Sequence, residues 1–130
     1  WVKRYLGSYL GQPLNFYTRI QLIRDFTGFA IGPHSDHFKK VAVLLLYLPE
    51  SADNAASGTS IYVPKKAGFT CEGGPHYESK NFDEVFTAPY LPNSALGFLK
   101  TNNSFHGAEP VSGIDARKGR NLIQCSLIEA

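Results

Sequence analysis

The sequence predicts an all-β fold, a sandwich or barrel with little helix. Two observations carry this prediction. Short runs rich in Val, Ile, Leu, Phe and Tyr recur along the 130 residues, and Gly, Pro, Asn and Asp residues separate them. Such residue types fit a pleated, half-buried surface, and many short runs of them divided by turn residues are typical of antiparallel sandwiches and barrels.

The expected strands lie close together along the chain, each of them a run of strand-forming residues next to turn-forming ones. In order they are Phe16–Asp25, Lys40–Leu48, Thr59–Pro64, Glu84–Pro89, Ser94–Leu99, Ser104–Val111 and Arg120–Ile128. Only Trp1–Gly11 has the apolar spacing of a helix. The small, polar segment Ser51–Ser57 is expected to be a loop. Gly68–Lys80, with three Gly and one Pro, is expected to be a long excursion between strands.

Length and composition predict a single globular domain over residues 1–130. The chain is 43% hydrophobic, and its net charge of +2 is spread without a basic stripe, so neither nucleic acid nor a membrane surface is an expected partner. No apolar stretch approaches the roughly 18 residues of a membrane-spanning helix, and no signal peptide is seen, so a cytoplasmic location is expected by default. The chain begins at Trp1 and contains no Met, so we expect part of the N-terminal region to be missing.

The two cysteines, Cys71 and Cys125, lie far apart and form no CxxC pair. One bridge makes no disulfide framework, so two reduced thiols are expected, with a single disulfide as the alternative.

The segment Gly32-Pro33-His34-Ser35-Asp36 carries the most chemical information. In an extended chain alternate side chains share a face, so His34 and Asp36 project the same way. An imidazole and a carboxylate are two of the three ligands of a two-His-one-carboxylate iron site, which keeps positions open for substrate and O2.

The third ligand is sought among the remaining histidines. His37 points to the opposite face from Asp36, and His76 lies in the glycine-rich excursion, where a ligand is not held rigidly. His106 lies in a predicted strand and is the expected third ligand. The alternative is a structural role: an HxD pair is common on surface strands, and a lone late His more often supports the core than binds metal.

From residue 19 onward the chain resembles the prolyl-4-hydroxylase-like branch of the 2-oxoglutarate/Fe(II) oxygenase superfamily. Several motifs carry the resemblance in the same order. They are Gly32–Asp36 ("GPHxD"), Val43–Leu48 (an apolar strand ending in "YL"), Gly58–Pro64 ("GGT", with Ser57 in place of the first Gly), Pro92–Phe98 ("PGxxLxF"), His106–Val111 ("HxVxPV") and Arg120–Ile123 ("R-x-L").

The resemblance implies a double-stranded β-helix, that is, a jelly roll or cupin-like barrel, with metal at its open mouth. The metal ligands would be His34, Asp36 and His106. The far carboxylate of 2-oxoglutarate would bind Arg120, whose planar fork suits a carboxylate. Arg117 is the alternative anchor, because the turn before Arg120 is longer than the family usually has.

Tyr47 matches the position at which this branch places a phenol on the same carboxylate, and its alternative role is that of a core aromatic. The resemblance also implies a helical layer behind the larger sheet, whereas only residues 1–14 precede the first expected strand. If part of the N-terminal region is missing, the resemblance implies a complete iron site and an incomplete substrate site.

The implied activity is a dioxygenase that hydroxylates an unactivated C–H of a peptidyl (prolyl) or small-molecule substrate. Its cofactors would be Fe(II) and the cosubstrate 2-oxoglutarate, with ascorbate as a candidate addition, and its coproducts succinate and CO2. Two rival hypotheses stay open. One is a cupin-like metal- or ligand-binding barrel without oxygenase activity, which has no need of Arg120 or Tyr47. The other is a structural or carbohydrate-binding jelly roll in which the HxD pair is accidental.

Overall fold

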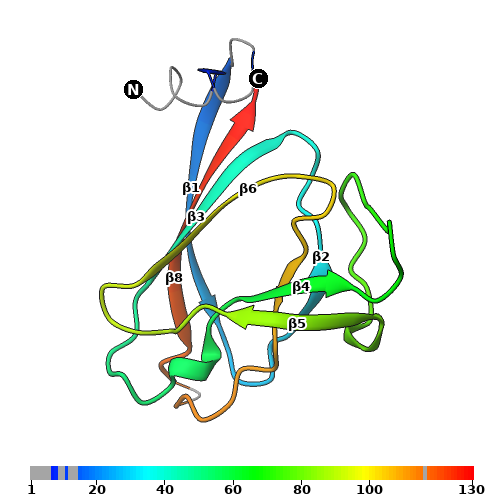
Figure 1. Cartoon of the computed structure of the whole chain (residues 1–130). Helices are drawn as coiled ribbons and strands as arrows, with labels where there is room; N and C mark the ends of the chain where they lie inside the picture. The colour runs from blue at the N-terminus through cyan, green and yellow to red at the C-terminus, as the bar shows by residue number, and fades with distance from the viewer. Residues whose placement is uncertain (1–6, 9–10, 12–14, 116) are drawn as a thin grey trace.

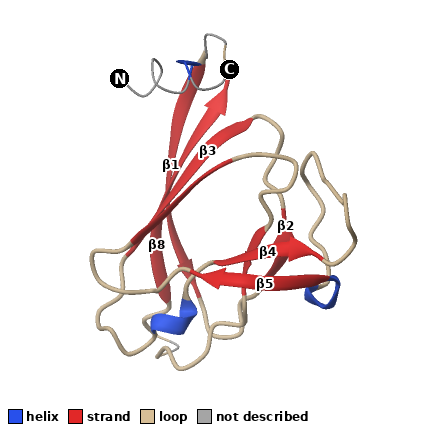
Figure 2. Cartoon of the chain, in the orientation of Figure 1, coloured by secondary structure: helices blue, strands red, loops and turns tan. Residues whose placement is uncertain are grey.

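A computed structural model describes residues 7, 8, 11, 15–115 and 117–130 of the chain (Figure 1). The expected helix over Trp1–Gly11 lies largely outside the described residues. The strands are β1 Phe16–Asp25, β2 Ile31–His34, β3 Lys40–Tyr47, β4 Ser60–Pro64, β5 Phe82–Thr87, β6 Ala95–Leu99, β7 His106–Ala108 and β8 Arg120–Glu129. Two single-turn 3-10 helices lie in the connections, η1 (Ala55–Ser57) between β3 and β4 and η2 (Ser79–Asn81) between β4 and β5 (Figure 2).

The strands form two four-stranded antiparallel sheets. The major sheet has the order β1-β8-β3-β6, and the minor sheet has the order β2-β7-β4-β5. Every connection between successive strands except the β4–β5 hairpin crosses from one sheet to the other. The chain thus winds around the space between the sheets, which is the topology of a double-stranded β-helix, and the predicted all-β jelly roll is confirmed.

The main core lies between the sheets and follows strand alternation. In β3, Val43, Leu45 and Tyr47 are buried, whereas Leu44 between them is 41% exposed on the outer face. Leu122 of β8 and Tyr90 join this cluster. The outer face of the major sheet remains apolar, with Ile20 and Leu22 of β1 also exposed.

The strands differ most from the predicted ones at three places, and four others differ by one residue at an end. β2 (Ile31–His34) was not among the expected strands. β5 covers Phe82–Thr87 instead of Glu84–Pro89, because Phe82 pairs with Pro64 and is buried against Tyr62. β7 is only three residues long, although a strand was predicted over Ser104–Val111. Beyond the end of β7, the Val111 amide donates to the Phe29 carbonyl oxygen at 2.9 Å, and the Val111 carbonyl oxygen accepts from the Gly28 amide at 2.9 Å.

Residues 68–80, called the strap below, are more ordered than a loose excursion. Phe69 and Tyr77 of the strap pack against a second buried cluster of Tyr62, Phe82 and Phe105. The strap therefore packs on the minor sheet through a cluster of aromatic side chains that is separate from the main core. Both cysteines are free thiols, as expected. Among the described residues, no helix has the length and apolarity needed to cross a bilayer.

Candidate metal centre

Strand pairing brings the three predicted ligands together. His34 is the last residue of β2 and pairs with His106, the first residue of β7, while Asp36 follows two residues after His34. One ligand atom of each residue lies within 4.8 Å of the others. The two imidazole rings have centroids 4.4 Å apart. Among the described residues, this is the one group of three or more His, Cys, Asp or Glu side chains that converges in this way.

Backbone hydrogen bonds fix the same ring nitrogen in both histidines. His34 Nδ1 lies 3.0 Å from the Gly32 carbonyl oxygen, and His106 Nδ1 lies 3.0 Å from that of Ser104. A carbonyl oxygen can only accept, so each Nδ1 carries the proton and donates. Each Nε2 then presents its lone pair to the centre, which is how ligating histidines are oriented in metal sites.

Burial keeps both imidazoles neutral. Removal from water, together with the neighbouring His106 ring, lowers the pKa of His34 to about 4. Burial also lowers the pKa of His106. Because a metal binds imidazole in its neutral form, both rings are ready to ligate at neutral pH.

Asp36 provides the test of whether a cation fits. The residue is only 8% exposed, and its Oδ2 is the buried side-chain atom that lacks a hydrogen-bond partner among the described residues. This oxygen lies 3.6 Å from His106 Nε2. Lys40 Nζ bonds the other oxygen, Oδ1, at 2.5 Å. A neutral imidazole offers Oδ2 no proton at Nε2, so this oxygen stays without a hydrogen bond in the interior, which is costly. A divalent cation between these three residues would satisfy it.

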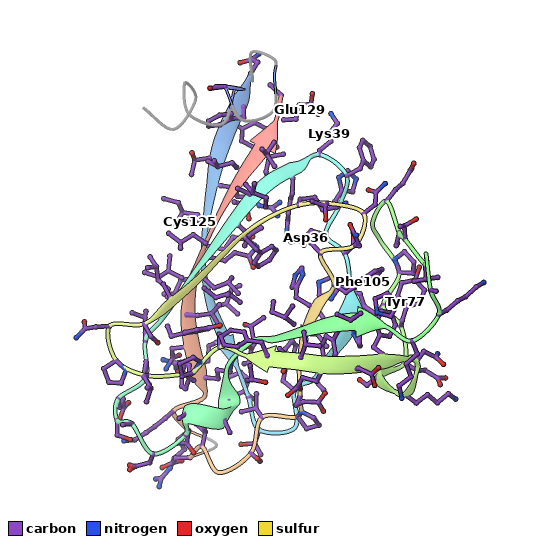
Figure 3. The ribbon with its side chains drawn as sticks, viewed as in Figure 1. Asp36, Lys39, Tyr77, Phe105, Cys125 and Glu129 are labelled. Atoms are coloured by element: carbon purple, nitrogen blue, oxygen red, sulfur yellow. The ribbon has the colours of Figure 1, made fainter. Side chains whose placement is uncertain are left out.

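The strap holds the ligand segment from outside. Ser35, between the two ligands, is completely buried, and its hydroxyl donates to the Cys71 carbonyl oxygen at 2.9 Å. The Tyr77 amide donates to the Pro33 carbonyl oxygen at 2.8 Å. Figure 3 shows Asp36 facing the space between the sheets and Tyr77 on the strap side. The extended geometry of the HxD pair therefore depends on the strap.

The other two histidines behave differently from one another. His37 is exposed and stacks on Phe38, as its position on the opposite face predicts. His76 is also exposed, but its ring centroid lies only 4.5 Å from that of His34. It is not one of the three converging ligands, yet the strap brings it to the edge of the site. Sequence reasoning missed this proximity, and only the folding of the strap reveals it.

A cavity of about 150 Å³ opens between the sheets at the site. Its walls include all three ligands, together with Phe98, Leu122 and other apolar side chains. Polar residues in the wall are Asp25, Thr59, Arg120 and Gln124. The cavity therefore joins the candidate metal centre to a buried guanidinium.

Arg120 is 3% exposed, but its charge already has a partner. Nη1 donates to Asp25 Oδ2 at 2.5 Å, Nε to the Ser57 carbonyl oxygen at 2.5 Å, and Nη2 to Thr59 Oγ1 at 3.2 Å. Asp25 and Arg120 face each other across the β1–β8 ladder. A buried Arg120 therefore does not by itself call for an external anion, because Asp25 is its counter-ion.

The other two candidates for cosubstrate binding are placed differently. Tyr47 is buried, and its hydroxyl accepts a hydrogen bond from the Thr59 amide at 3.2 Å. Its ring centroid lies 6.0 Å from the Arg120 guanidinium carbon, so it borders the same region. The Arg117 side chain is 92% exposed beside Asp115 and does not line the cavity.

No known family model matches this sequence, and no curated protein matches it. Among solved structures, one similar chain is the dTDP-4-dehydrorhamnose 3,5-epimerase from Bacillus anthracis str. Ames, crystallised with TDP and PPi bound. The two chains share 14% sequence identity with a TM-score of 0.41, and the match covers 98% of this chain but 61% of the epimerase. The chain thus spans less than two thirds of that enzyme, and a likeness this distant says nothing about activity.

Proposed function

We propose that this barrel binds one divalent transition metal through His34, Asp36 and His106 and acts as a 2-oxoglutarate-dependent dioxygenase when that metal is Fe(II). The observation that carries the proposal is the unpaired, buried Asp36 Oδ2 beside two neutral imidazoles whose Nε2 atoms are free. Two imidazoles and one carboxylate are the ligand set of non-haem Fe(II) oxygenases. Fe(II) bound there would supply the capacity to activate O2 and hydroxylate a C–H bond, with 2-oxoglutarate converted to succinate and CO2.

The residues of the cavity support a cosubstrate beside the metal. A guanidinium has five N–H donors, and the three bonds of Arg120 leave one donor on Nη1 and one on Nη2. A guanidinium can pair with a carboxylate through two of its donors. Arg120 is thus proposed to take the far carboxylate of 2-oxoglutarate, with Tyr47 keeping the Thr59 amide in place nearby.

A second candidate function is a cupin-like metal- or ligand-binding barrel without oxygenase activity. One observation favours it: Asp25 already neutralises Arg120. A ligand carboxylate on Arg120 would lie next to the Asp25 carboxylate, and the repulsion between like charges would weaken its binding. The metal centre is common to both candidates, which differ only in what Arg120 binds.

An anaerobic titration separates the two candidates. Fe(II) is added to the protein, followed by 2-oxoglutarate, and the visible charge-transfer absorption of the iron–oxo-acid chelate is recorded. The dioxygenase proposal expects the band in the natural protein, a cosubstrate affinity at least tenfold weaker in Arg120→Ala, and no change in the exposed control Arg117→Ala. Bound Fe(II) without a band supports the barrel without oxygenase activity, and absence of Fe(II) binding leaves the structural jelly roll.

The substrate class and compartment are proposed on chemical grounds. The substrate is a peptidyl side chain, such as proline, or a small molecule with an unactivated C–H, and neither nucleic acid nor a membrane is a proposed partner. Two free thiols and an oxygen-sensitive Fe(II) site suit a reducing compartment, so the cytoplasm is the proposed location.

A further inference from the structure

The carboxylate of the candidate metal centre has a second, cationic neighbour. Lys40 is the first residue of β3, and a tight turn, closed by a 2.9 Å bond from the Lys40 amide to the His37 carbonyl oxygen, returns its side chain toward Asp36. Lys40 Nζ lies 2.5 Å from Asp36 Oδ1. The two side chains are only 13% and 10% exposed, so this ion pair is largely screened from water.

We propose that Lys40 is a built-in counter-ion of the candidate metal centre. Its ammonium group neutralises the Asp36 carboxylate in the metal-free protein and weakens the binding of a divalent cation to that carboxylate. An ionised carboxylate in a mostly buried site needs a cation nearby. His34 and His106 each donate Nδ1–H to a backbone carbonyl oxygen, so neither ring gives that proton to Asp36. Lys40 makes the direct ionic contact with Asp36.

The two oxygens of Asp36 have different roles in this arrangement. Oδ1 is bonded to Lys40, whereas Oδ2 has no partner and lies 3.6 Å from His106 Nε2. Oδ2 is therefore the oxygen left for a metal, and Lys40 restricts the carboxylate to one ligating atom. A carboxylate that ligates through one atom leaves more positions open on the metal than one that ligates through two.

The sign of the effect on metal affinity distinguishes a counter-ion from an ordinary support. A neutral group that bonds a ligating side chain raises affinity, and its loss typically weakens metal binding by about 10- to 100-fold. An ammonium group instead repels the incoming dication and reduces the charge on the ligand. Removing the Lys40 ammonium should therefore strengthen metal binding and lower the stability of the metal-free protein.

The chain provides a matched control. Lys39 carries the same charge one residue earlier, but its side chain is exposed and its carbonyl oxygen accepts from the Glu129 amide. Figure 3 shows Lys39 near Glu129 at the end of β8, away from Asp36. Lys39→Met thus removes one positive charge from the surface without touching the ligand.

The experiment measures Mn(II) affinity by calorimetry and urea unfolding of metal-free protein, both near pH 7.5. We expect Lys40→Met to bind Mn(II) at least tenfold more tightly and to unfold at lower urea than the natural chain, with Lys39→Met and Lys40→Arg close to the natural values. If Lys40→Met is unfolded without metal, folding on addition of Mn(II) supports the proposal. Weaker Mn(II) binding in Lys40→Met, or a chain that stays unfolded with Mn(II), overturns it.

This inference rests on the proposed metal site. A second comparison distinguishes a failure of the Lys40 role from a failure of the metal site. Lys40→Met is also introduced into the Asp36→Asn variant, in which the side chain at position 36 has no charge to neutralise. The counter-ion role predicts that Lys40→Met lowers the urea midpoint when Asp36 is present and changes it little in the Asp36→Asn background. If the natural chain binds no Mn(II), the proposed function fails, while equal losses in both backgrounds overturn the role of Lys40.

Discussion

At the scale of single residues, the two imidazoles of the candidate metal centre are expected to make the metal-free barrel sensitive to acid. Burial lowers the pKa of His34 from 6.5 to about 4, whereas the unfolded chain protonates this residue near 6.5. Between these values the unfolded state binds more protons, so the free energy of unfolding falls as the pH falls from about 6.5 toward 4 and is level above about 6.5. The burial-lowered pKa of His106 acts in the same direction.

This linkage predicts a urea midpoint for metal-free protein that is clearly lower at pH 5 than at pH 7.5. The part due to His34 is on the order of 1 kcal/mol once solvent screening of this partly buried ring is allowed for. His34→Gln should flatten the dependence, because its side chain does not titrate. Equal midpoints at the two pH values would show that the ring is as well solvated in the folded chain as in the unfolded one.

The buried pair of Asp25 and Arg120 makes a second prediction at this scale. Arg120→Ala leaves the Asp25 carboxylate, 7% exposed, without its cation, and breaking a buried pair from one side typically costs about 3–5 kcal/mol. The double variant Asp25→Asn/Arg120→Ala should recover much of this loss. Denaturant unfolding of the three proteins checks it, and a double variant no more stable than Arg120→Ala would contradict the ion pair.

At the scale of elements, the strap contacts the segment that carries the candidate ligands His34 and Asp36 from outside the barrel. A Cβ on Gly73, whose φ is +131°, would lie 2.2 Å from the Asp36 carbonyl oxygen. Gly74, with φ +116°, has open space around the same position. Both glycines adopt a backbone conformation that disfavours side chains, so the difference between them isolates the clash with the ligand segment.

Gly73→Ala is therefore expected to weaken Mn(II) binding at least tenfold, because the strap or Asp36 has to move. Gly74→Ala carries the strain without the clash and should cost about 1 kcal/mol of stability with Mn(II) affinity retained. Calorimetric titration of both variants tests this. Equal losses of affinity would mean that strap and ligand segment are not in contact in solution.

The strands were predictable from sequence for a reason that does not apply to the strap. Runs such as Lys40–Leu48 consist of residue types that favour strands, so the local sequence is enough to predict the strand. The order of residues 68–80 depends on distant partners, such as Ser35 for the Cys71 carbonyl and Tyr62 for Phe69. Three glycines and a proline suggest looseness, and nothing local shows the contacts that offset it.

At the scale of the whole molecule, the candidate site shows the same contrast between what local sequence predicts and what distant contacts decide. His34, Asp36 and His106 were predictable because the parity of an extended strand and the small number of histidines left few alternatives. The partner of Arg120 was not, because Asp25 becomes its neighbour only through the register of β1 against β8, strands at opposite ends of the chain. Arg120 is buried, but the counter-ion that it contacts depends on which strands pair.

The candidate metal centre depends on the whole barrel, since β2 and β7 meet only after the chain has wound between both sheets. The most direct measurement is the number of Mn(II) or Fe(II) ions bound per chain, determined by anaerobic equilibrium binding. We predict one ion for the natural protein and for His76→Ala, and loss of tight binding in His34→Ala and in His106→Ala. Normal stoichiometry in the folded His106→Ala variant would contradict the assignment of His34, Asp36 and His106 as the ligands.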